Sequence, residues 1–395
     1  MLKEKLIENE GWEDPSVNSL AASGGERLLV EKKFVTFPEK FELESGEYLP
    51  ELTIAYETVG TLNEKKDNAI LIIHALTGDA HCCGYHSNDP DEKPGWWDQL
   101  IGPGKGIDTN KYFVICSNIL GGCSGTTGPT SIDPRTGKRY NMTFPDITFG
   151  DMVEAQKKLL DFLGVPKLLS VVGGSMGGMM VLEWARRWPN LVSSIVAIAT
   201  NSSLSPQAIG FSEIERQAIK LDPKWKNGDY DPDDPPADGL AIARKIAHIT
   251  YLSQQSMRTK FGRRKQKAGN HESDQFEVES YLDYQGRRFV DRFDANSYIA
   301  ITEALDEYDL AREGETLDDA VAPIKSLALF LSFRTDWLFP TKETAELVNA
   351  MRRLGKFVEF HEIDSPRGHD AFLIEYPKYE NLVARFLERV YANYN

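Results

Sequence analysis

The chain has 395 residues, of which 41% are hydrophobic, so it is long enough to bury one sizeable α/β core together with an insertion. Its net charge of −15 disfavours nucleic acid and anionic membranes as partners, and no apolar run approaches the length of a membrane span. The charged N-terminus lacks the apolar core of a secretory signal, and the four cysteines form no Cys-x-x-Cys pair. These features predict a cytoplasmic protein with reduced thiols, no disulfide framework and no zinc or other metal site.

The first half of the chain predicts an extension followed by a sheet. Residues 1–28 are polar and charged, with Ser, Asn and Gly interruptions, and predict a loosely attached extension. Two stretches of alternating polarity, 29–37 and 52–59, predict an antiparallel hairpin at a sheet edge, and 149–163 predicts a helix with one apolar side. Because apolar strands alternate with helical stretches, we expect a mostly parallel sheet. These strands are expected at residues 69–76, 112–117, 168–172 and 194–199.

The string GGSMG, residues 173–177, places Ser175 between glycines. An apolar stretch, 168–172, precedes it and a helical stretch, 179–188, follows it, which is the strand, turn and helix of a nucleophile elbow. Such a turn requires small residues two positions before and after the serine, and the following helix directs its positive N-terminal end at the reacting group. A glycine-rich turn with a helix-capping serine is the alternative.

The alternation of strands and helices stops after Thr200. Residues 201–317 contain no convincing buried strand and are helical, charged and rich in Gln, Arg and Asp. A segment that leaves and re-enters a sheet at the carboxyl ends of its strands overhangs the site formed there. We therefore interpret 201–317 as a helical lid inserted into a core of residues 29–200 and 318–395. A plain surface insertion is the alternative.

A serine nucleophile requires an acid and a histidine, which in α/β-hydrolases follow the serine in that order, each after a later strand. Asp336 follows an apolar strand at 326–333, and His369 follows the next strand. The acid fixes the tautomer of the imidazole, which takes the proton from the serine. His361 lies within a strand, and the remaining histidines precede the acid. The order predicts an α/β-hydrolase fold, a mostly parallel sheet flanked by helices, with a triad of Ser175, Asp336 and His369.

The oxyanion formed when the serine attacks needs two backbone donors. Met176, directly after the serine, is expected to supply one N–H, and the loop after the strand at 69–73 the other. In that loop, HALTGD, the N–H of Leu76 is the expected donor. Each such donor typically stabilises the transition state by about 2.7–4 kcal/mol.

Other glycine-rich and basic runs are less specific. The runs at 102–106 and 121–129 lack the Gly-Lys-Ser/Thr ending of a phosphate-binding loop, which argues against a nucleotide-hydrolysing function. The basic run at 260–267 lies within the expected lid. It is either a solvated face or a contact for the phosphates of a carrier such as coenzyme A.

Several strings, found in order from about residue 30 to the C-terminus, carry a resemblance to a known family. They are HALTGD (74–79), GWWDQLIGPGKGIDTNKYFVICSN (95–118), LGGCSGTTGPTSI (120–132), GGSMGGM (173–179), RQAI (216–219), DPKW (222–225), IAHITYLS (246–253) and GHDAFL (368–373). On these strings the chain resembles the homoserine O-acetyltransferase family. The resemblance implies an α/β-hydrolase fold with a helical lid, a homodimer formed through the lid helices, and a triad at Ser175, Asp336 and His369.

The same resemblance implies a reaction. An acetyl group would pass from acetyl-CoA, a co-substrate, to the hydroxyl of L-homoserine by a ping-pong acyl-serine mechanism in methionine biosynthesis, with no permanently bound cofactor. By matching motif positions, Arg216 would hold the substrate carboxylate, Asp370 its ammonium, and Thr77 would line the same pocket. The plainer alternatives are a helix N-cap for Asp370 and a surface partner of Glu213 or Glu215 for Arg216.

Alternatives within and outside the family stay open. Some family members use succinyl-CoA as donor or serine as acceptor; a plain serine esterase would share the triad, and a binding protein on an inactive scaffold is a different class. A succinyl group requires an extra cation, and the sequence places no Arg or Lys next to Leu76 or Ser175, so acetyl is preferred. Homoserine and serine differ by one methylene, worth only about 1–3 kcal/mol, which leaves no mark in the sequence.

Overall fold

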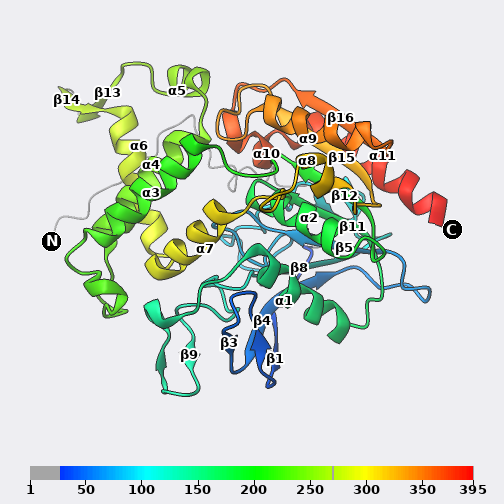
Figure 1. Ribbon diagram of the computed structural model, residues 1–395. Helices are drawn as coiled ribbons and strands as arrows, with labels where there is room; N and C mark the ends of the chain where they lie inside the picture. The colour runs from blue at the N-terminus through cyan, green and yellow to red at the C-terminus, as the bar shows by residue number, and fades with distance from the viewer. Residues whose placement is uncertain (1–26, 269–270, 395) are drawn as a thin grey trace.

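The computed structural model describes residues 27–268 and 271–394 (Figure 1). The extension predicted for residues 1–28 lies outside the described part of the chain, except for its last two residues. One eight-stranded sheet organises the fold, in the order β1-β4-β8-β5-β11-β12-β15-β16. Its strands are, in that order, Lys33–Phe37, Leu52–Val59, Phe113–Ser117, Ala69–Ile73, Leu168–Gly174, Val192–Ile198, Leu327–Phe333 and Val358–Ile363.

The sheet is parallel except at one edge. β1 pairs antiparallel with β4, and β4 with β8, whereas all pairs from β8 to β16 are parallel. Every residue of β5, β11 and β12 is buried, because helices cover both faces of the sheet. The mostly parallel sheet and the antiparallel edge hairpin are confirmed.

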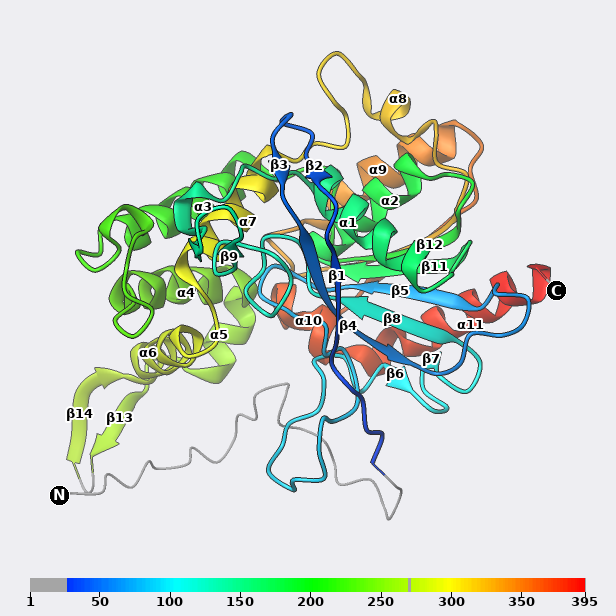
Figure 2. The ribbon, with the colours of Figure 1, turned by 90° about the horizontal axis from the view of Figure 1, so that it is seen from below.

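Helices form a layer on each face of the sheet (Figure 2). On one side, α1 (Phe149–Phe162), α2 (Met176–Arg187) and α9 (Thr341–Arg353) pack in one apolar cluster, with the short α8 (Leu317–Val321) against α9. On the other side, α11 (Tyr376–Tyr394) packs in a second cluster. This layered arrangement is the predicted α/β-hydrolase architecture. No helix in the described part of the chain combines the length and apolar character that a membrane span needs.

The C-terminal helix differs from the single amphipathic helix that the sequence predicts over 371–391. It is divided into α10 (Ala371–Ile374) and α11, with Glu375 between them. Pro377 explains the division, because it has no N–H to donate to the carbonyl of Leu373 and its ring would collide with that carbonyl in a continuous helix. Proline is tolerated in a first helical turn, where α11 places it.

A group of helices lies beside the sheet and falls between β12 and β15 in the sequence (Figures 1 and 2). Its members are α3 (Pro206–Lys220), α4 (Ala237–Tyr251), α5 (Gln254–Lys260), α6 (Glu277–Val290) and α7 (Ala295–Glu307). The two ends of the group meet where Ser203 and Asp309 form an antiparallel bridge. That 201–317 acts as a lid stays a prediction.

The sequence does not predict one hairpin in this group, formed by β13 (Lys265–Ala268) and β14 (His271–Phe276). Its strands, KQKA and HESDQF, are almost wholly polar, so no apolar alternation marks them. Shorter elements complete the described fold. They are the strand pairs β2 (Phe41–Glu42) with β3 (Tyr48–Leu49), β6 (Ile101–Gly102) with β7 (Ile107–Asp108) and β9 (Ile132–Asp133) with β10 (Lys138–Arg139), and the turns η1 (Asn141–Thr143), η2 (Lys226–Gly228) and η3 (Gly368–Asp370).

Candidate active site

Ser175 occupies the turn between β11 and α2. Its backbone has φ 58° and ψ −129°, a conformation that a residue with a side chain seldom adopts. The N–H of Ser175 donates to the carbonyl of Ile198 in β12 (2.9 Å), so the neighbouring strand holds the strained turn. α2 begins at the next residue, and its first N–H groups are directed towards the turn.

Glycines on both sides of Ser175 make this turn possible. A Cβ atom on Gly173 would lie 2.5 Å from the carbonyl oxygen of Gly177, and one on Gly177 would lie 2.4 Å from that of Ile73. Cβ atoms do not approach backbone atoms so closely, so both positions exclude a side chain. The glycines on both sides of Ser175 are therefore required by two close contacts of α2. One contact is with β5, and the other is with β11, the strand that leads into the turn.

The structure brings the three predicted catalytic residues together. His369 Nε2 lies 2.8 Å from Ser175 Oγ, and His369 Nδ1 lies 2.7 Å from Asp336 Oδ2. All three are buried, with exposed fractions of 8% for Ser175, 4% for Asp336 and 3% for His369. β11, β15 and β16 are parallel strands of one sheet, so the residues that follow them gather at the same edge.

The backbone of its own loop fixes the carboxylate of Asp336. Oδ1 accepts hydrogen bonds from the N–H groups of Leu338 (3.0 Å) and Phe339 (2.9 Å), which leaves Oδ2 to face His369. An ionised carboxylate can only accept, so the imidazole proton must be on Nδ1. The lone pair of Nε2 is then directed at Ser175, as a general base requires.

Further contacts hold the imidazole. Thr335 Oγ1 donates to the carbonyl of Ser365 (2.7 Å) and accepts from the N–H of Gly368 (3.0 Å), which ties the acid loop to the histidine loop. Phe339 stacks on the imidazole with 5.0 Å between ring centroids. Tyr251, at the end of α4, approaches the same ring to 6.0 Å. The inserted helices therefore reach the triad.

Leu76 lies in the loop after β5, and Met176 is the first residue of α2. His74 fixes this loop, because its Nδ1–H donates to the carbonyl of Ala75 (2.7 Å) and its Nε2 accepts from the N–H of Ile119 (3.1 Å). Burial lowers the pKa of His74, so the ring stays neutral, as this bonding requires. Because His74 precedes Asp336 in the sequence, chain order excludes it as the catalytic base. Nothing in the sequence indicates that it positions the loop of Leu76.

Two arginines from the inserted helices contact Thr77 in the same loop. Arg292 donates to the carbonyl of Thr77 (2.9 Å), and Arg244 Nη1 lies 3.5 Å from Thr77 Oγ1. Burial, reinforced by the charge of Arg244, lowers the pKa of Arg292 to about 10, although part of its side chain is exposed, so it stays charged at neutral pH. The absence of Arg or Lys among the sequence neighbours of Leu76 therefore does not mean that the folded loop lacks a nearby cation. The arginines lie 167 and 215 residues away in the sequence, where adjacency cannot reveal them.

Arg216 is buried on α3 and pairs with carboxylates. Its guanidinium lies 2.7 Å from Asp306 Oδ2 and 3.1 Å from Glu213 Oε2. The contact with Asp306 lacks the angles of a hydrogen bond, so it is an ion pair. No hydrogen bond or ion pair joins Arg216 to the triad. The pairing with Glu213 agrees with the plainer alternative for Arg216, although Arg216 is buried and does not lie on the surface.

Asp370 directly follows His369 and occupies the N-cap position of α10, as the simpler alternative expects, although its side chain makes no capping hydrogen bond there. Burial raises the pKa of Tyr251 to about 12; Arg244 opposes this shift, and Glu215 and Asp370 add to it. These charges therefore surround the tyrosine that lies beside the imidazole. Charged groups of both signs near the triad suit a substrate that carries an ammonium and a carboxylate.

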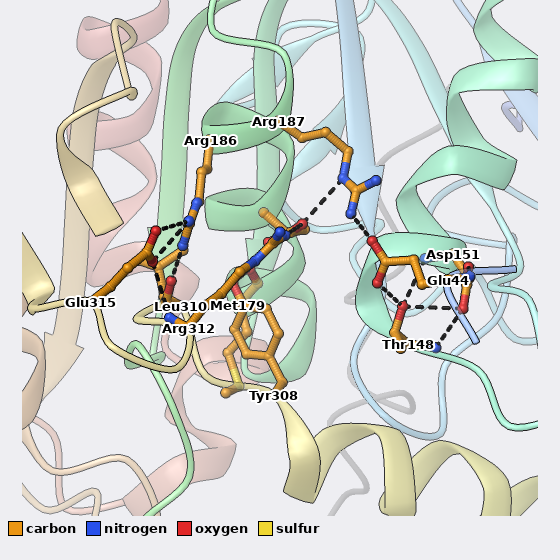
Figure 3. Close-up of polar contacts among 11 residues, drawn as sticks. Glu44, Thr148, Asp151, Met179, Arg186, Arg187, Tyr308, Leu310, Arg312 and Glu315 are labelled. Carbon is orange, nitrogen blue, oxygen red and sulfur yellow. Dashed lines mark hydrogen bonds and ion pairs between the residues drawn. The ribbon is translucent and has the colours of Figure 1, made fainter. Parts of the chain in front are cut away.

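Polar contacts anchor α2, the helix that starts at the elbow, to distant parts of the chain (Figure 3). At its C-terminal end, Arg186 binds both carboxylate oxygens of Glu315 (2.8 and 2.9 Å) and Arg187 binds Glu44. The hydroxyl of Tyr308 donates to a carbonyl within α2 (3.2 Å). Basic side chains at a helix C-terminus also oppose the helix dipole. Tyr308 and Glu315 follow α7, so the segment returning from the inserted helices is tied to the elbow helix.

Comparisons with known proteins agree with this geometry. The family model for the alpha/beta hydrolase fold matches residues 68–376. The chain is 53% identical to a homoserine O-acetyltransferase of Deferribacter desulfuricans, over 92% of this chain and 97% of that protein, and 52% identical to one of Solidesulfovibrio magneticus, over 91% and 93%. The chain belongs to the homoserine O-acetyltransferase family.

Solved structures include a member of this family and an esterase. Homoserine O-acetyltransferase from Bacillus anthracis matches with a TM-score of 0.85 at 31% identity, over 91% of this chain and 98% of that one. Esterase E22 matches with a TM-score of 0.83 at 28% identity, over 91% and 100%. The fold alone therefore does not separate a transferase from an esterase. The sequence identity places the chain in a family of acyltransferases.

Proposed function

We propose that this chain transfers an acetyl group from acetyl-CoA to the hydroxyl of L-homoserine through an acyl-serine intermediate. One observation carries the proposal: Ser175, His369 and Asp336 are in contact at a nucleophile elbow, in a chain 53% identical to a homoserine O-acetyltransferase. Replacing Ser175 by alanine tests it. Homoserine-dependent release of CoA that survives within about tenfold would contradict the triad assignment.

In the first half-reaction, His369 Nε2 takes the proton of Ser175 Oγ, which lies 2.8 Å away, and Oγ attacks the thioester carbonyl. The resulting oxyanion is placed at the N–H groups of Leu76 and Met176. The C–S bond then breaks, and the imidazolium returns its proton to the thiolate of CoA. Asp336 stabilises the imidazolium while it exists.

In the second half-reaction, the hydroxyl of homoserine replaces CoA. His369 takes the hydroxyl proton, the oxygen attacks the acyl-serine, and the proton passes to Ser175 as the ester leaves. Water must not reach this intermediate, or the enzyme becomes a thioesterase. The inserted helices, which bring Tyr251 to the imidazole, are proposed to act as the lid that excludes it.

The pocket is proposed to bind homoserine by its two charges, beside Thr77. Asp370, next to the base, would hold the ammonium, and Arg216 would exchange an ion pair with Glu213 or Asp306 for the substrate carboxylate. Arg216→Gln should raise the KM for homoserine about 10- to 100-fold, since a hydrogen bond to a charged group contributes about 1.5–3 kcal/mol.

The control for this test is the same substitution at Arg385, which is exposed on α11. The KM for acetyl-CoA should change little in both variants. An unchanged KM for homoserine in the Arg216 variant would show that another residue binds the carboxylate of homoserine. Arg244 and Arg292, which contact the Thr77 loop, would then be the residues to replace.

The choice of acetyl over succinyl rests on the relatives being homoserine O-acetyltransferases, since Arg244 and Arg292 provide the cations that a succinyl carboxylate would need. The steady-state kcat/KM for acetyl-CoA and succinyl-CoA, with homoserine and with serine as acceptors, tests both choices. We expect the pair of acetyl-CoA and homoserine to give the highest value. A higher kcat/KM for succinyl-CoA would make succinyl-CoA the donor and would leave the assignment of the triad unchanged.

A serine esterase is the second candidate, because esterase E22 matches this fold almost as well as the transferase does. Incubation with acetyl-CoA, with and without homoserine, distinguishes the two. A transferase releases CoA faster when homoserine is present and forms O-acetylhomoserine. An esterase releases CoA at the same rate in both cases.

A homodimer formed through the inserted helices is part of the proposal. Ile214 and Leu221, on and directly after α3, are 53% and 80% exposed, and Ile242 and Ile249 on α4 are 47% and 42% exposed. Each pair is seven residues apart and so shares one helix face, which suits helix–helix pairing. The double variant Ile242→Glu, Ile249→Glu should be a monomer by light scattering. The control Leu354→Glu changes an exposed residue directly after α9, outside the inserted helices, and should remain a dimer. A monomeric wild-type protein would contradict this part.

The cellular setting completes the proposal. Methionine biosynthesis in the cytoplasm, with acetyl-CoA as co-substrate and no permanently bound cofactor, is what the family resemblance implies. Cys82, Cys83, Cys116 and Cys123 are free thiols, which supports a reducing compartment.

A further inference from the structure

Three metal-binding side chains converge beside the loop that carries Leu76. Glu57 belongs to β4, and His81 and His86 lie in the segment after that loop. Glu57 Oε2 lies 2.8 Å from His81 Nδ1, and Glu57 Oε1 lies 2.8 Å from His86 Nε2. One candidate ligand atom from each residue lies within 4.8 Å of the other two. The cluster plays no part in the mechanism described above.

The burial of the three side chains differs in a way that suits a bound ion. The side chain of Glu57 is 2% exposed, that of His81 15% and that of His86 41%, so the cluster has a closed floor and an open entrance. The ion pairs of Glu57 in the described part of the chain are with these two imidazoles, and none is with Lys or Arg. A buried carboxylate requires a compensating charge, which a cation bound by one of its oxygens would supply.

The donor set selects the kind of ion. Two imidazole nitrogens and one carboxylate favour zinc and neighbouring divalent transition metals over Mg²⁺ or Ca²⁺, which prefer oxygen ligands. In a tetrahedral zinc site with bonds of about 2.0–2.2 Å, ligand atoms stand roughly 3.3 Å apart. The two observed N···O distances of 2.8 Å run to different oxygens of Glu57, and one ligand atom from each residue lies within 4.8 Å of the others, so the three side chains reach this spacing by small rotations. Glu92, whose Oε1 lies 3.8 Å from His86 Nδ1, is placed to orient that ring from outside.

We propose that Glu57, His81 and His86 bind one divalent transition metal ion of the zinc class, which ties β4 to the oxyanion loop. On binding, the protons that now face Glu57 move to the other nitrogen of each ring, and three coordinate bonds replace two hydrogen bonds. The backbone N–H of His81 donates to Asp79 Oδ1 (2.9 Å), so an ion held by His81 also restrains Asp79 at the end of the oxyanion loop. The sequence-based expectation of no metal site rested on the cysteine pattern and did not consider this cluster.

Zinc binding to chelator-treated full-length protein tests the proposal. We expect one equivalent of Zn²⁺ by competition with a chromophoric chelator, and a zinc-dependent rise in the unfolding temperature that Mg²⁺ does not reproduce. His86→Gln should weaken binding by more than about tenfold and abolish the rise. Its folding is not at risk because His86 is partly exposed, and His361→Gln, on β16, is the matched control.

Spectroscopy provides a second measurement that does not depend on stability. Co²⁺ bound at this site should give the visible absorption of a nitrogen- and oxygen-ligated ion in the wild-type and His361 variants, and none in the His86 variant. Binding that persists unchanged in His86→Gln would place the ion elsewhere, for example at the thiols of Cys82 and Cys116, and overturn the proposal. Less than one equivalent bound by the wild-type protein would also overturn it.

Discussion

Asp336→Asn tests how the acid loop controls the tautomer of His369. The N–H groups of Leu338 and Phe339 require an acceptor at the position of Oδ1, so the amide oxygen of Asn must stay there. Its NH2 group then faces His369 Nδ1, and because NH2 only donates, Nδ1 must accept. The imidazole proton therefore moves to Nε2, where it points at Ser175 and blocks removal of the serine proton.

The magnitude follows from the same contacts. Rotating the amide by half a turn would place NH2 against two backbone donors and leave both unsatisfied, at about 1–3 kcal/mol each, so the rotated form is a minor species. The base is then almost wholly in the wrong tautomer. In a serine protease triad the same change lowers kcat roughly 10⁴-fold, which corresponds to about 5.5 kcal/mol.

The assay is homoserine-dependent release of CoA from acetyl-CoA, followed by the free thiol. Asp364→Asn is the matched control, since Asp364 is an exposed carboxylate in the histidine loop, paired with Arg334. We expect near wild-type activity for the control and an unfolding temperature within a few degrees of wild type for both variants. Activity of Asp336→Asn within tenfold of wild type, in a folded protein, would refute the reasoning.

Three further substitutions test other parts of the structure. Gly177→Ala would place a Cβ atom 2.4 Å from a backbone oxygen, so we expect a loss of at least about 1–3 kcal/mol of stability, and an unchanged unfolding temperature would contradict the close approach. Burial raises the pKa of Glu215 from 4.5 to about 7, so the folded state binds this proton more tightly than the unfolded state does. As pH rises from 4.5 through 7, the free energy of unfolding should therefore fall by about 3 kcal/mol. Glu215→Gln should remove this loss, so that its stability relative to wild type increases from pH 5 to pH 8; a constant difference in urea unfolding would be evidence against the shift. Thr335→Val removes the hydrogen bonds to Ser365 and Gly368 and should lower kcat while the KM for homoserine holds; equal kcat values would show that this link does not position the histidine.

The parts of the fold that the sequence predicts are those in which local pattern and structure coincide. β5, β11 and β12 are buried on both faces, and their apolar runs can be recognised without knowledge of their neighbours. The elbow is recognisable because the steric demand of a sharp turn is met by glycines at fixed spacing from Ser175. Chain order then identifies Asp336 and His369, because parallel strands deliver the following residues to one edge.

The parts that the sequence does not predict depend on contacts between distant segments. Arg244 and Arg292 reach Thr77 only because α4 and the turn after α6 lie against the oxyanion loop. The convergence of Glu57 with His81 and His86 requires the register of β4 within the sheet, which no local pattern encodes. The polar hairpin of β13 and β14 lacks the alternation on which strand prediction relies.

The central claim is that Ser175 carries the acyl group between acetyl-CoA and homoserine. The most direct measurement is mass spectrometry of protein quenched after mixing with acetyl-CoA, followed by digestion and sequencing of the peptide that contains Ser175. The account predicts one acetyl group on Ser175, lost rapidly on addition of homoserine as O-acetylhomoserine forms, and no label in Ser175→Ala. Absence of the label from Ser175 during turnover, or its loss at the same rate with and without homoserine, would contradict the account.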